Sequence, residues 1–304
     1  MQILIVGSVN MDVVVRVDHV PGPGENVRCN DLATIPGGKG ANQAVACARM
    51  GAGVNFLGRV GDDEFGRRLR TSLQEVGVGV EALQTVAGAT SGVALILVSA
   101  KGEASLIITP GANGRLGAAD VLAARPLFDQ ADAVLVQLEI PAEAVAAAIR
   151  LGREAGKPVI VDAGPPRLPI ETAVFEATIL TPNEAEAAAL LGVAPGSQRP
   201  EELAAELWAL GPQAVVLKAG AYGAVVADGK RLLHVPGFRI DPVDTTAAGD
   251  AFTAALTVAI LEGADLAHAA QTANAAGALA CLKLGAQPSL PTAGEVAAFL
   301  AAHT

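Results

Sequence analysis

The chain has 304 residues, of which 51% are hydrophobic and 17% are charged. This composition excludes a disordered or fibrous protein, because it supplies ample apolar side chains for a buried core. The formal net charge of −10, without a run of basic residues, excludes nucleic acid as an expected partner, because an acidic chain repels phosphate backbones.

Short apolar segments recur along the chain and are typical of strands buried on both faces. They lie at residues 3–6, 134–136, 159–161, 178–180, 215–217 and 224–226. Alanine-rich segments between them predict helices at residues 40–50, 65–76, 143–155, 184–191, 200–210, 250–261 and 266–284. This alternation predicts an α/β protein with a mostly parallel sheet that is covered by helices.

Two segments, at about residues 11–35 and 91–110, interrupt the alternation within a predicted single domain over residues 1–304. The second is predicted to be a hairpin that turns at residues 101–103, and together the two predict a small separate sheet. Insertions after parallel strands lie where such folds bind ligands. The small sheet is therefore either a lid or an ordinary surface hairpin, and the pattern leaves both open.

The cysteines and the apolar segments indicate the cellular compartment in which the protein is expected. Cys29, Cys47 and Cys281 have neither the spacing of a zinc site nor that of a disulfide framework. The N-terminus lacks the basic residues of a signal peptide, and the longest apolar segment, at residues 251–261, is well short of the ~20 residues of a membrane span. We therefore expect a cytoplasmic protein without a membrane partner.

A glycine-rich segment, PGGKGANQAVACARMG at residues 36–51, leads into a predicted helix and surrounds Lys39 with glycines. Glycines let backbone amides approach a ligand at a helix N-terminus, where negative charge is stabilised. The spacing is not that of a Walker A loop. Taken alone, the glycines are explained more simply by a tight strand-to-helix connection.

A second segment, VDTTAAGDAFTAAL at residues 243–256, carries small residues into a helix with Asp250 in its first turn. Free amides there stabilise negative charge, and small side chains leave room for a phosphoryl group. A carboxylate beside that group could remove a proton from an attacking hydroxyl. The alternative is that Asp250 only caps the helix.

Further polar groups follow predicted strands. In GSVNMD, residues 7–12, Asn10 and Asp12 share one face of an extended chain and suit sugar hydroxyls, although a simple turn also explains them. Glu139 follows another strand. In TPNEAE, residues 181–186, Asn183 and Glu184 could cap a helix and Glu186 could be solvated surface.

In this order and spacing, GSVNMD, GGKGANQA, TPNEAE and DTTAAGD resemble the PfkB family of carbohydrate kinases, also called the ribokinase family. The resemblance covers essentially the whole chain and implies a three-layer α/β/α sandwich with a small β-sheet lid. It also implies transfer of the γ-phosphate of ATP to the 5-hydroxyl of D-ribose. Kinases for fructose, 2-keto-3-deoxygluconate or adenosine, and a sugar-binding protein without catalysis, stay as alternatives.

The resemblance also implies roles for individual residues. Asp250 matches the catalytic base, and Ala247, Ala248 and Gly249 match an anion hole of backbone amides. The positions that match sugar-binding residues are Asn10, Asp12, Gly38, Lys39, Asn42, Glu139 and Asp250. The positions that match nucleotide-binding residues are Asn183, Lys218, Gly220, Gly223, Gly249 and Asn274. Members of the family commonly have threonine in place of Lys218, which leaves its contact open.

Metal ions and a partner subunit follow from the same resemblance. It implies Mg²⁺ near Glu186, held largely through water, and K⁺ as an activator. The positions that match the potassium loop are Asp244, Thr246, Ala280, Lys283, Gly285 and Ser289. It also implies a homodimer through the lid sheets, because the apolar faces of residues 13–17 and 93–98 would be poorly buried in a monomer.

Overall fold

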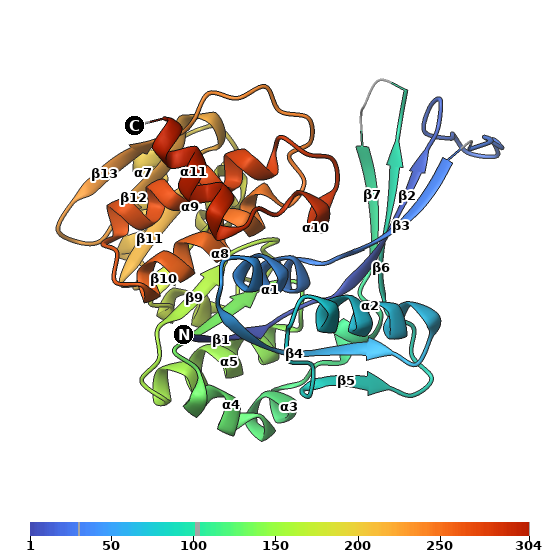
Figure 1. The fold of residues 1–304 in the computed structure, drawn as a ribbon, viewed down its shortest axis with the longest axis horizontal. Coiled ribbons are helices and arrows are strands. Elements are labelled where there is room, and N and C mark those ends of the chain that lie inside the picture. Colours follow the sequence, from blue (N-terminus) through green and yellow to red (C-terminus); the bar gives the residue numbers. More distant parts are fainter. Residues whose placement is uncertain (30, 101–103, 304) are drawn as a thin grey trace.

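A nine-stranded sheet forms the centre of the molecule in the computed structural model, which describes residues 1–29, 31–100 and 104–303 (Figure 1). In order, its strands are β13 (Leu232–Pro236), β12 (Gly223–Ala227), β11 (Ala214–Lys218), β10 (Ile179–Leu180), β9 (Val159–Asp162), β8 (Ala133–Gln137), β1 (Gln2–Val6), β4 (Gly53–Gly61) and β5 (Leu83–Val86). Strands β11 to β5 of this order are parallel, and β12 and β13 form an antiparallel edge. The predicted mostly parallel sheet is confirmed.

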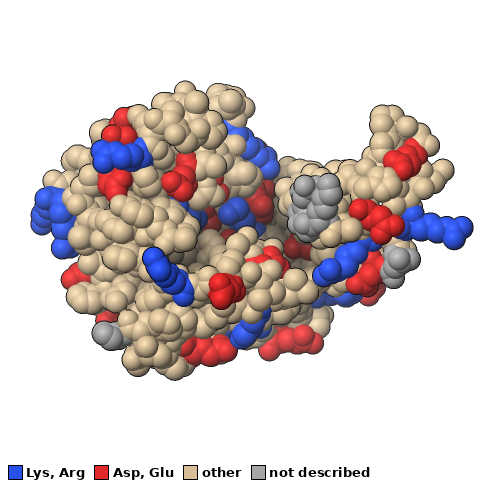
Figure 2. Space-filling view, turned by 90° about the horizontal axis from the view of Figure 1, so that it is seen from above, with Lys and Arg blue, Asp and Glu red and all other residues tan. Residues whose placement is uncertain are grey.

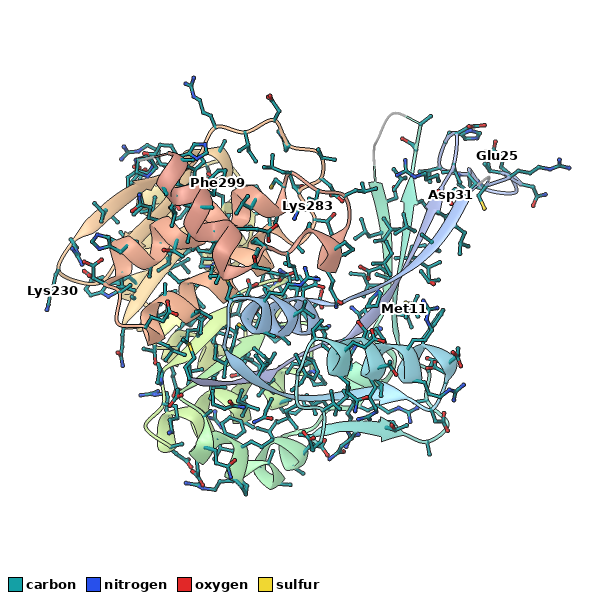
Figure 3. All side chains as sticks on the ribbon, viewed as in Figure 1. Met11, Glu25, Asp31, Lys230, Lys283 and Phe299 are labelled. Atoms are coloured by element: carbon teal, nitrogen blue, oxygen red, sulfur yellow. The ribbon has the colours of Figure 1, made fainter. Side chains whose placement is uncertain are left out.

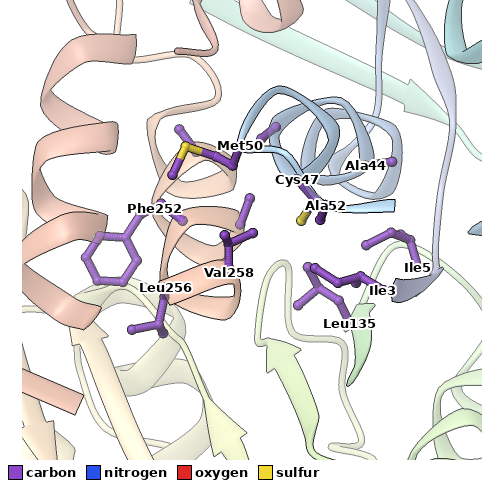
Figure 4. Close-up of a cluster of buried hydrophobic side chains, with 14 of the residues drawn as sticks. Ile3, Ile5, Ala44, Cys47, Met50, Ala52, Leu135, Phe252, Leu256 and Val258 are labelled. Carbon is purple, nitrogen blue, oxygen red and sulfur yellow. The ribbon is translucent and has the colours of Figure 1, made fainter. Parts of the chain in front are cut away.

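Helices cover both faces of this sheet, because successive strand residues point to opposite sides. Ile3 and Ile5 belong to one buried cluster, which Figure 4 shows with Phe252 of a covering helix, while Leu4 and Val6 belong to another. The first cluster includes residues of α1 (Lys39–Arg49), α2 (Glu64–Glu75), α8 (Ala248–Leu261), α9 (Leu266–Ala280) and α11 (Ala293–Ala302). The second includes residues of α3 (Ala118–Ala123), α4 (Arg125–Gln130), α5 (Ala142–Glu154), α6 (Glu184–Leu191) and α7 (Pro200–Ala209). The molecule is thus a three-layer α/β/α sandwich.

A four-stranded small sheet stands apart from this sandwich (Figure 1). Its order is β3 (Asp31–Gly37), β2 (Asn10–Arg16), β6 (Gly92–Val98) and β7 (Ala104–Thr109). Strands β2 and β6 are parallel, and the two outer pairs are antiparallel. Figure 3 places Met11 at the base of this sheet and Asp31 and Glu25 near its far end. The predicted small sheet is confirmed, while the hairpin turn predicted at residues 101–103 lies outside the described residues.

Some predicted boundaries were wrong for identifiable reasons. The helix predicted over residues 266–284 ends at Ala280, because the Cys281 carbonyl instead accepts hydrogen bonds from the amides of Val243 and Asp244. Strand β4 was missed because glycine and polar residues interrupt its apolar pattern. Strands β5 and β13, the short helices α3, α4 and α10 (Ala286–Ser289) and the ten-residue helix α11 were missed as well. Three short 3₁₀ helices, η1 (Gly111–Arg115), η2 (Thr172–Glu176) and η3 (Gly220–Tyr222), complete the described elements.

The apolar segment at residues 251–261 lies within α8, which is buried from Asp250 to Ala259. In the part of the chain that the structure describes, no helix has the length and apolar character needed to cross a membrane.

Candidate active site

The polar residues singled out in the sequence gather at the carboxyl edge of the parallel strands. Asn10 follows β1, Glu139 follows β8, Asn183 follows β10, and Asp162 and Lys218 are the last residues of β9 and β11. The carboxyl ends of parallel strands meet at one edge of a sheet, where α/β proteins bind ligands. Figure 2 shows the surface hollowed between the main body and the small sheet, with acidic and basic side chains in its walls.

Asp250 lines a cavity of about 310 Å³ from the first turn of α8. It is 5% exposed, and its carboxylate accepts hydrogen bonds from Asn42 Nδ2 at 2.9 Å and Gln43 Nε2 at 3.0 Å. Burial raises the pKa of Asp250 to about 6, although Lys39 opposes the shift. The start of α8 has Ala247 at its cap position and no side-chain cap, so the alternative that Asp250 only caps the helix is wrong.

The fully buried carboxylate of Asp162 lies next to this group, and sequence reasoning missed it. Gln43 Nε2 donates to Asp162 Oδ2 at 2.6 Å as well as to Asp250, so one amide bridges both carboxylates. Gln137 Nε2 donates to Gln43 Oε1 at 2.6 Å, which fixes the orientation of the bridging amide. Asp162, Gln43 and Gln137 therefore hold Asp250 in one orientation.

Two lysines flank Asp162. Lys218 Nζ lies 2.9 Å from Oδ1, and Lys39 Nζ lies 3.6 Å from Oδ2. Burial by itself would raise the pKa of Asp162, but Lys218 and Lys39 outweigh it and hold that pKa below its ordinary value. Burial would also lower the pKa of Lys39, but Asp162, Asp250 and other carboxylates outweigh it and raise that pKa. Lys39 therefore stays protonated in the site.

Asn10 and Asp12 lie at the base of the small sheet, at the start of β2. Asn10 is 5% exposed, and its Oδ1 accepts from Asn113 Nδ2 at 2.7 Å. Asn113 is fixed in turn by 3.0 Å hydrogen bonds to the backbone of Val9. Burial raises the pKa of Asp12 to about 7, and the negative charges of Glu139 and Asp250 add to the effect. These residues belong to a strand, so the alternative of a simple turn is wrong.

The glycine-rich segment packs its backbone against this group. Gly38 has φ 89°, and a Cβ there would lie 2.8 Å from the Asn10 nitrogen, so only glycine fits between β3 and α1. The Lys39 amide donates to Glu139 Oε2 at 3.1 Å, and Ser8 Oγ donates to the same oxygen at 2.5 Å. The segment is a tight strand-to-helix connection, and it also places Lys39 and Asn42 beside Asp250.

Asn183 and Glu186 cap α6 reciprocally. The Glu186 amide donates to Asn183 Oδ1 and the Asn183 amide to Glu186 Oε2, both at 2.8 Å. The expected capping role of Asn183 is confirmed, while the alternative of a solvated Glu186 is wrong because it is 9% exposed. Its other oxygen, Oε1, lies 3.9 Å from Lys39 Nζ. Both residues line the cavity that contains Asp250.

A second cavity, of about 350 Å³, adjoins the first. Lys218, Gly220, Thr245 and Gly249 line both. The wall of the second cavity is otherwise mostly glycine and apolar, and includes Gly223, Phe238, Ile240, Phe252, Asn274 and Gly277. Asn274 Nδ2 donates to the carbonyls of Val235 and Pro236 at 3.1 Å each, which ties α9 to β13. The continuous space suits an elongated ligand with a charged end at Asp250 and an apolar end at Phe252.

The turn before α8 exposes backbone amides to this space. Ala247 adopts a left-handed conformation with φ 61°, which aims the chain into the helix. The Ala248 amide donates to the Thr245 carbonyl at 3.2 Å. Within the described part of the chain, the amides of Gly249 and Asp250 have no acceptor, and both residues line the smaller cavity. Free amides at a helix start form an anion site.

The loop with Asp244 is held together by its carboxylate. Asp244 Oδ1 accepts from the amide and hydroxyl of Thr246, and Oδ2 accepts from the Gly285 amide at 2.8 Å. The structure thus brings Asp244, Thr246 and Gly285 together, and Cys281 joins them through its carbonyl. The Lys283 side chain pairs with Glu295 instead, and Ser289 Oγ donates to the Ala286 carbonyl. Ala280 ends α9 beside this loop.

Several buried residues of the site escaped sequence reasoning, among them Gln43, Gln137, Asp162 and Asn113. Gln43 stands next to Asn42 in a segment already singled out, and Asp162 is a charged residue that ends an apolar strand, so both carried a signal. Asn113 carried none, because its contact with Asn10 joins positions 103 residues apart. In the described ranges, no group of three or more histidine, cysteine, aspartate or glutamate side chains is arranged to hold a metal ion.

Comparison with known proteins gave consistent results. The family model described as pfkB family carbohydrate kinase matches residues 1–293. Ribokinase of Bacillus subtilis is 39% identical over 97% of both chains. The crystal structure of Thermotoga maritima ribokinase has a TM-score of 0.90 and 34% identity, covering 98% of this chain and 99% of that one. The Arabidopsis thaliana ribokinase structure, complexed with ribose and ATP, has a TM-score of 0.90 and 31% identity over 98% of both chains.

Proposed function

Because the chain belongs to the PfkB family of carbohydrate kinases, we propose that it transfers the γ-phosphate of ATP to the 5-hydroxyl of D-ribose, giving D-ribose 5-phosphate and ADP. The observation that carries this proposal is the position of Asp250. Its buried carboxylate accepts hydrogen bonds from Asn42 and Gln43 of α1 and lies beside the free amides at the start of α8. The Bacillus subtilis, Thermotoga maritima and Arabidopsis thaliana relatives, all ribokinases, support ribose as the sugar.

The sugar binds, in this proposal, at the base of the small sheet. Asn10, Asp12 and Glu139 offer amide and carboxylate groups to the hydroxyls, and Asn42 adds an amide whose Oδ1 is buried without a partner among the residues that the structure describes. Gly38 and Lys39 bring the backbone of the glycine-rich segment against the same ligand. Buried polar groups of this kind favour a ligand that satisfies them all, because an unmatched partner leaves them unsatisfied.

The reaction is an in-line displacement at the γ-phosphorus. Asp250 removes the proton of the 5-hydroxyl as its oxygen bonds to phosphorus, and the bond from phosphorus to the β–γ bridging oxygen breaks to release ADP. In the turn from Ala247 to Asp250, the free amides of Gly249 and Asp250 face the phosphoryl oxygens, because the Ala248 amide already donates to the Thr245 carbonyl, and Lys39 adds a positive charge. The raised pKa of Asp250 suits a base that works near neutral pH.

The nucleotide occupies the larger cavity in this proposal. Gly220 and Gly223 line it without side chains, and Asn274 contributes an amide side chain to the wall. Asn183 and Lys218 lie on the path of the phosphates. Adenine is a flat apolar ring with polar edges, and it fits a cavity with an apolar wall and one amide side chain.

Glu186 fits a role toward Mg²⁺. Its carboxylate lines the same cavity as Asp250, and a Cβ on Gly164 would lie 1.8 Å from its Oε1, so the chain leaves that oxygen space. Mg²⁺ is usually held by one or two carboxylates, water and substrate phosphates, which agrees with Glu186 as the one acidic side chain proposed to hold it. When bound, the ion would neutralise charge on the phosphates.

The loop at Asp244 fits a role toward K⁺. Its carboxylate joins the residue 244–246 turn to the segment after α9. The proposed ligands are oxygen atoms, several of them backbone carbonyls, of Asp244, Thr246, Ala280, Lys283, Gly285 and Ser289. The side chain of Lys283 points to Glu295 and leaves its carbonyl as the available group. An ion at this loop would order the turn before α8 without touching the substrate. We expect K⁺ to raise turnover above that in choline chloride of equal ionic strength, and Asp244→Ala to remove the response.

The small sheet is proposed to act as a lid over the sugar and as a dimer interface. Residues 13–15 and 95–98 are only half-buried, and Leu32, Leu106, Ile107 and Ile108 on the edge strands are more than half exposed. Apolar surface of this extent favours a second copy of the sheet as its cover. Light scattering should give the mass of a dimer at micromolar concentration, and Ile107→Lys should give the monomer. A wild-type monomer would contradict the proposal.

A cytoplasmic location is part of the proposal as well. Cys29, Cys47 and Cys281 are free thiols, as expected in a reducing compartment. Cell fractionation of the source organism tests it.

The experiment for the whole proposal is ADP release from ATP and Mg²⁺, with and without K⁺, against a panel of acceptors. The panel contains D-ribose, fructose, 2-keto-3-deoxygluconate and adenosine. Preference for ribose supports the proposal, while preference for another acceptor keeps the kinase and overturns the sugar. If ribose binds in calorimetry but no acceptor is phosphorylated, the chain is a binding protein.

A further inference from the structure

Lys218 lies where the two cavities meet. It lines both, whereas Lys39 lines only the cavity with Asp250. Its side chain is 10% exposed, and a Cβ placed on Gly249 would be 3.6 Å from its Nζ. The ammonium group is therefore next to the free amides at the start of α8, on the nucleotide side of Lys39.

Asp162 holds this ammonium group in place. Lys218 ends β11 and Asp162 ends β9, with β10 between them. Strands are about 4.8 Å apart, so the lysine reaches roughly 10 Å across β10 to meet the carboxylate. Strand β10 has only two residues, Ile179–Leu180, and the Lys218 amide is anchored by a 2.8 Å hydrogen bond to the Pro182 carbonyl. Both ends of the lysine are thus fixed.

The Lys218 ammonium group lies where negative charge would develop during phosphoryl transfer. As the bond to the γ-phosphorus breaks, negative charge accumulates on the β–γ bridging oxygen and the β-phosphate of the departing ADP. Lys39, beside Asp250, faces the phosphoryl group that is transferred. Lys218 is a second cation that lies nearer the nucleotide cavity, and it faces the departing ADP.

We propose that Lys218 contacts the β-phosphate of the nucleotide and that Asp162 is the residue that positions it. The inference rests on the proposed kinase function and extends it to the leaving group. Asp162 also binds Gln43, which donates to Asp250. One buried carboxylate therefore connects the group that accepts the proton with the group that stabilises the departing ADP.

A simpler role for Lys218 is to neutralise Asp162, because a buried carboxylate without a partner is strongly destabilising. The two roles separate when both charges are removed together. If Lys218 serves only Asp162, the double variant Lys218→Met/Asp162→Asn recovers both stability and nucleotide binding. If Lys218 contacts the β-phosphate, the double variant recovers stability alone.

The experiment compares the wild type, Lys218→Met, Asp162→Asn and the double variant. Thermal unfolding reports stability, and calorimetry reports the affinities for ADP and for adenosine. Lys218→Met should lower the unfolding temperature, and the double variant should regain most of the loss. Both should bind ADP about tenfold to a hundredfold more weakly, as expected for a lost charge-assisted contact, with adenosine affinity unchanged. Asp162→Asn keeps the lysine without its anchor and should weaken ADP binding less.

The matched control is Lys230→Met, in the turn between β12 and β13 on the far side of the molecule from the small sheet (Figure 3). It should change neither affinity. Wild-type ADP affinity in the double variant would overturn the proposal, as would an equal loss for adenosine. Ribose-dependent ADP release by the wild type is measured in parallel and tests the kinase function separately, because nucleotide affinity does not depend on the identity of the sugar.

Discussion

The two halves of the site differ in the kinds of residue that line them. On the side proposed to bind the sugar, buried and half-buried side chains from distant segments hydrogen-bond to one another: Asn10 to Asn113, Ser8 to Glu139 and Asn42 to Asp250. On the nucleotide side, glycines and apolar residues surround an open cavity of about 350 Å³. Where fixed polar side chains bind a ligand, each of them contributes to selectivity for that ligand. Where backbone groups and the shape of a cavity bind it, the loss of any single side chain changes the affinity less. A single substitution should therefore lower substrate affinity more on the side proposed to bind the sugar than on the side proposed to bind the nucleotide.

The largest effect is expected at the point where the halves meet. Asp250→Asn keeps the shape of the side chain and removes the proposed base, so kcat should fall about 10³-fold, within the usual contribution of general base catalysis. Initial rates of ADP release with ribose measure this change. Circular dichroism and ribose affinity serve as controls for folding. Turnover within tenfold of the wild type would show that another group takes the proton.

The loss of activity at low pH should follow the protonation of the Asp250 carboxylate. Asp250 acts as a base only when deprotonated, and burial raises its pKa to about 6, so kcat/KM should fall by about tenfold per unit as pH drops below that value. Lys39, Asp162 and Asp12 face this carboxylate and set the position of the midpoint. Rates measured from pH 4.5 to 9 give the midpoint. A profile flat down to pH 4.5 contradicts the assignment.

Asn10→Ala tests the sugar half directly. It removes a proposed sugar contact and leaves Asn113 Nδ2 without its side-chain acceptor, so KM for ribose should rise about tenfold to a hundredfold. KM for ATP should stay within a factor of two, because Asn10 does not line the nucleotide cavity. Saturation curves for each substrate measure the two constants. Equal rises in KM for ribose and KM for ATP would show that the two halves do not bind their ligands independently.

Asn274→Ala is the matching test on the nucleotide half. Its side chain donates to two carbonyls of β13 and touches the cavity from one side only, so KM for ATP should rise by about threefold to tenfold. KM for ribose should not change. A loss as large as that of Asn10→Ala for ribose would mean that the nucleotide half also depends on single side chains.

The smallest effect is expected at Ala247. Its left-handed backbone costs an L-residue about 1–2 kcal/mol, which glycine avoids, while glycine adds about 0.4–1 kcal/mol of entropy to the unfolded chain. Ala247→Gly should therefore change the free energy of unfolding by about 1 kcal/mol or less and leave kcat nearly unchanged. Urea unfolding measures the first quantity. A large loss of stability would mean that the Ala247 methyl group contributes substantially to packing.

Local patterns predicted the layers of the fold and the residues that follow its strands. The strand of residues 3–6 and the helix beginning at Glu184 were evident because burial on both faces and a capping residue each leave a local signature. The end of α9 could not be predicted, because it depends on amides of Val243 and Asp244 that compete for the Cys281 carbonyl from nearly 40 positions away.

The site shows the same limit. Asp250 and Lys39 stand in distinctive segments, whereas the bridge from Gln43 to Asp162 spans 119 positions and the contact from Lys218 to Asp162 spans 56. A charged residue that ends an apolar strand indicates a functional edge, but its partner depends on the order of strands in the sheet. That order places β9 and β11 on either side of a two-residue strand, and neither chain segment carries a sign of it.

All four strands of the small sheet join the main body at the same end, through the chain before Asn10, after Gly37, before Gly92 and after Thr109. Mechanically this is a plate clamped along one short side, and such a plate deflects by bending along its length instead of swinging on a hinge. Deflection is smallest at the clamp and greatest at the free end. Asn10 and Asp12 lie at the clamp, so the residues proposed to hold the sugar should keep their positions while the far end of the sheet moves.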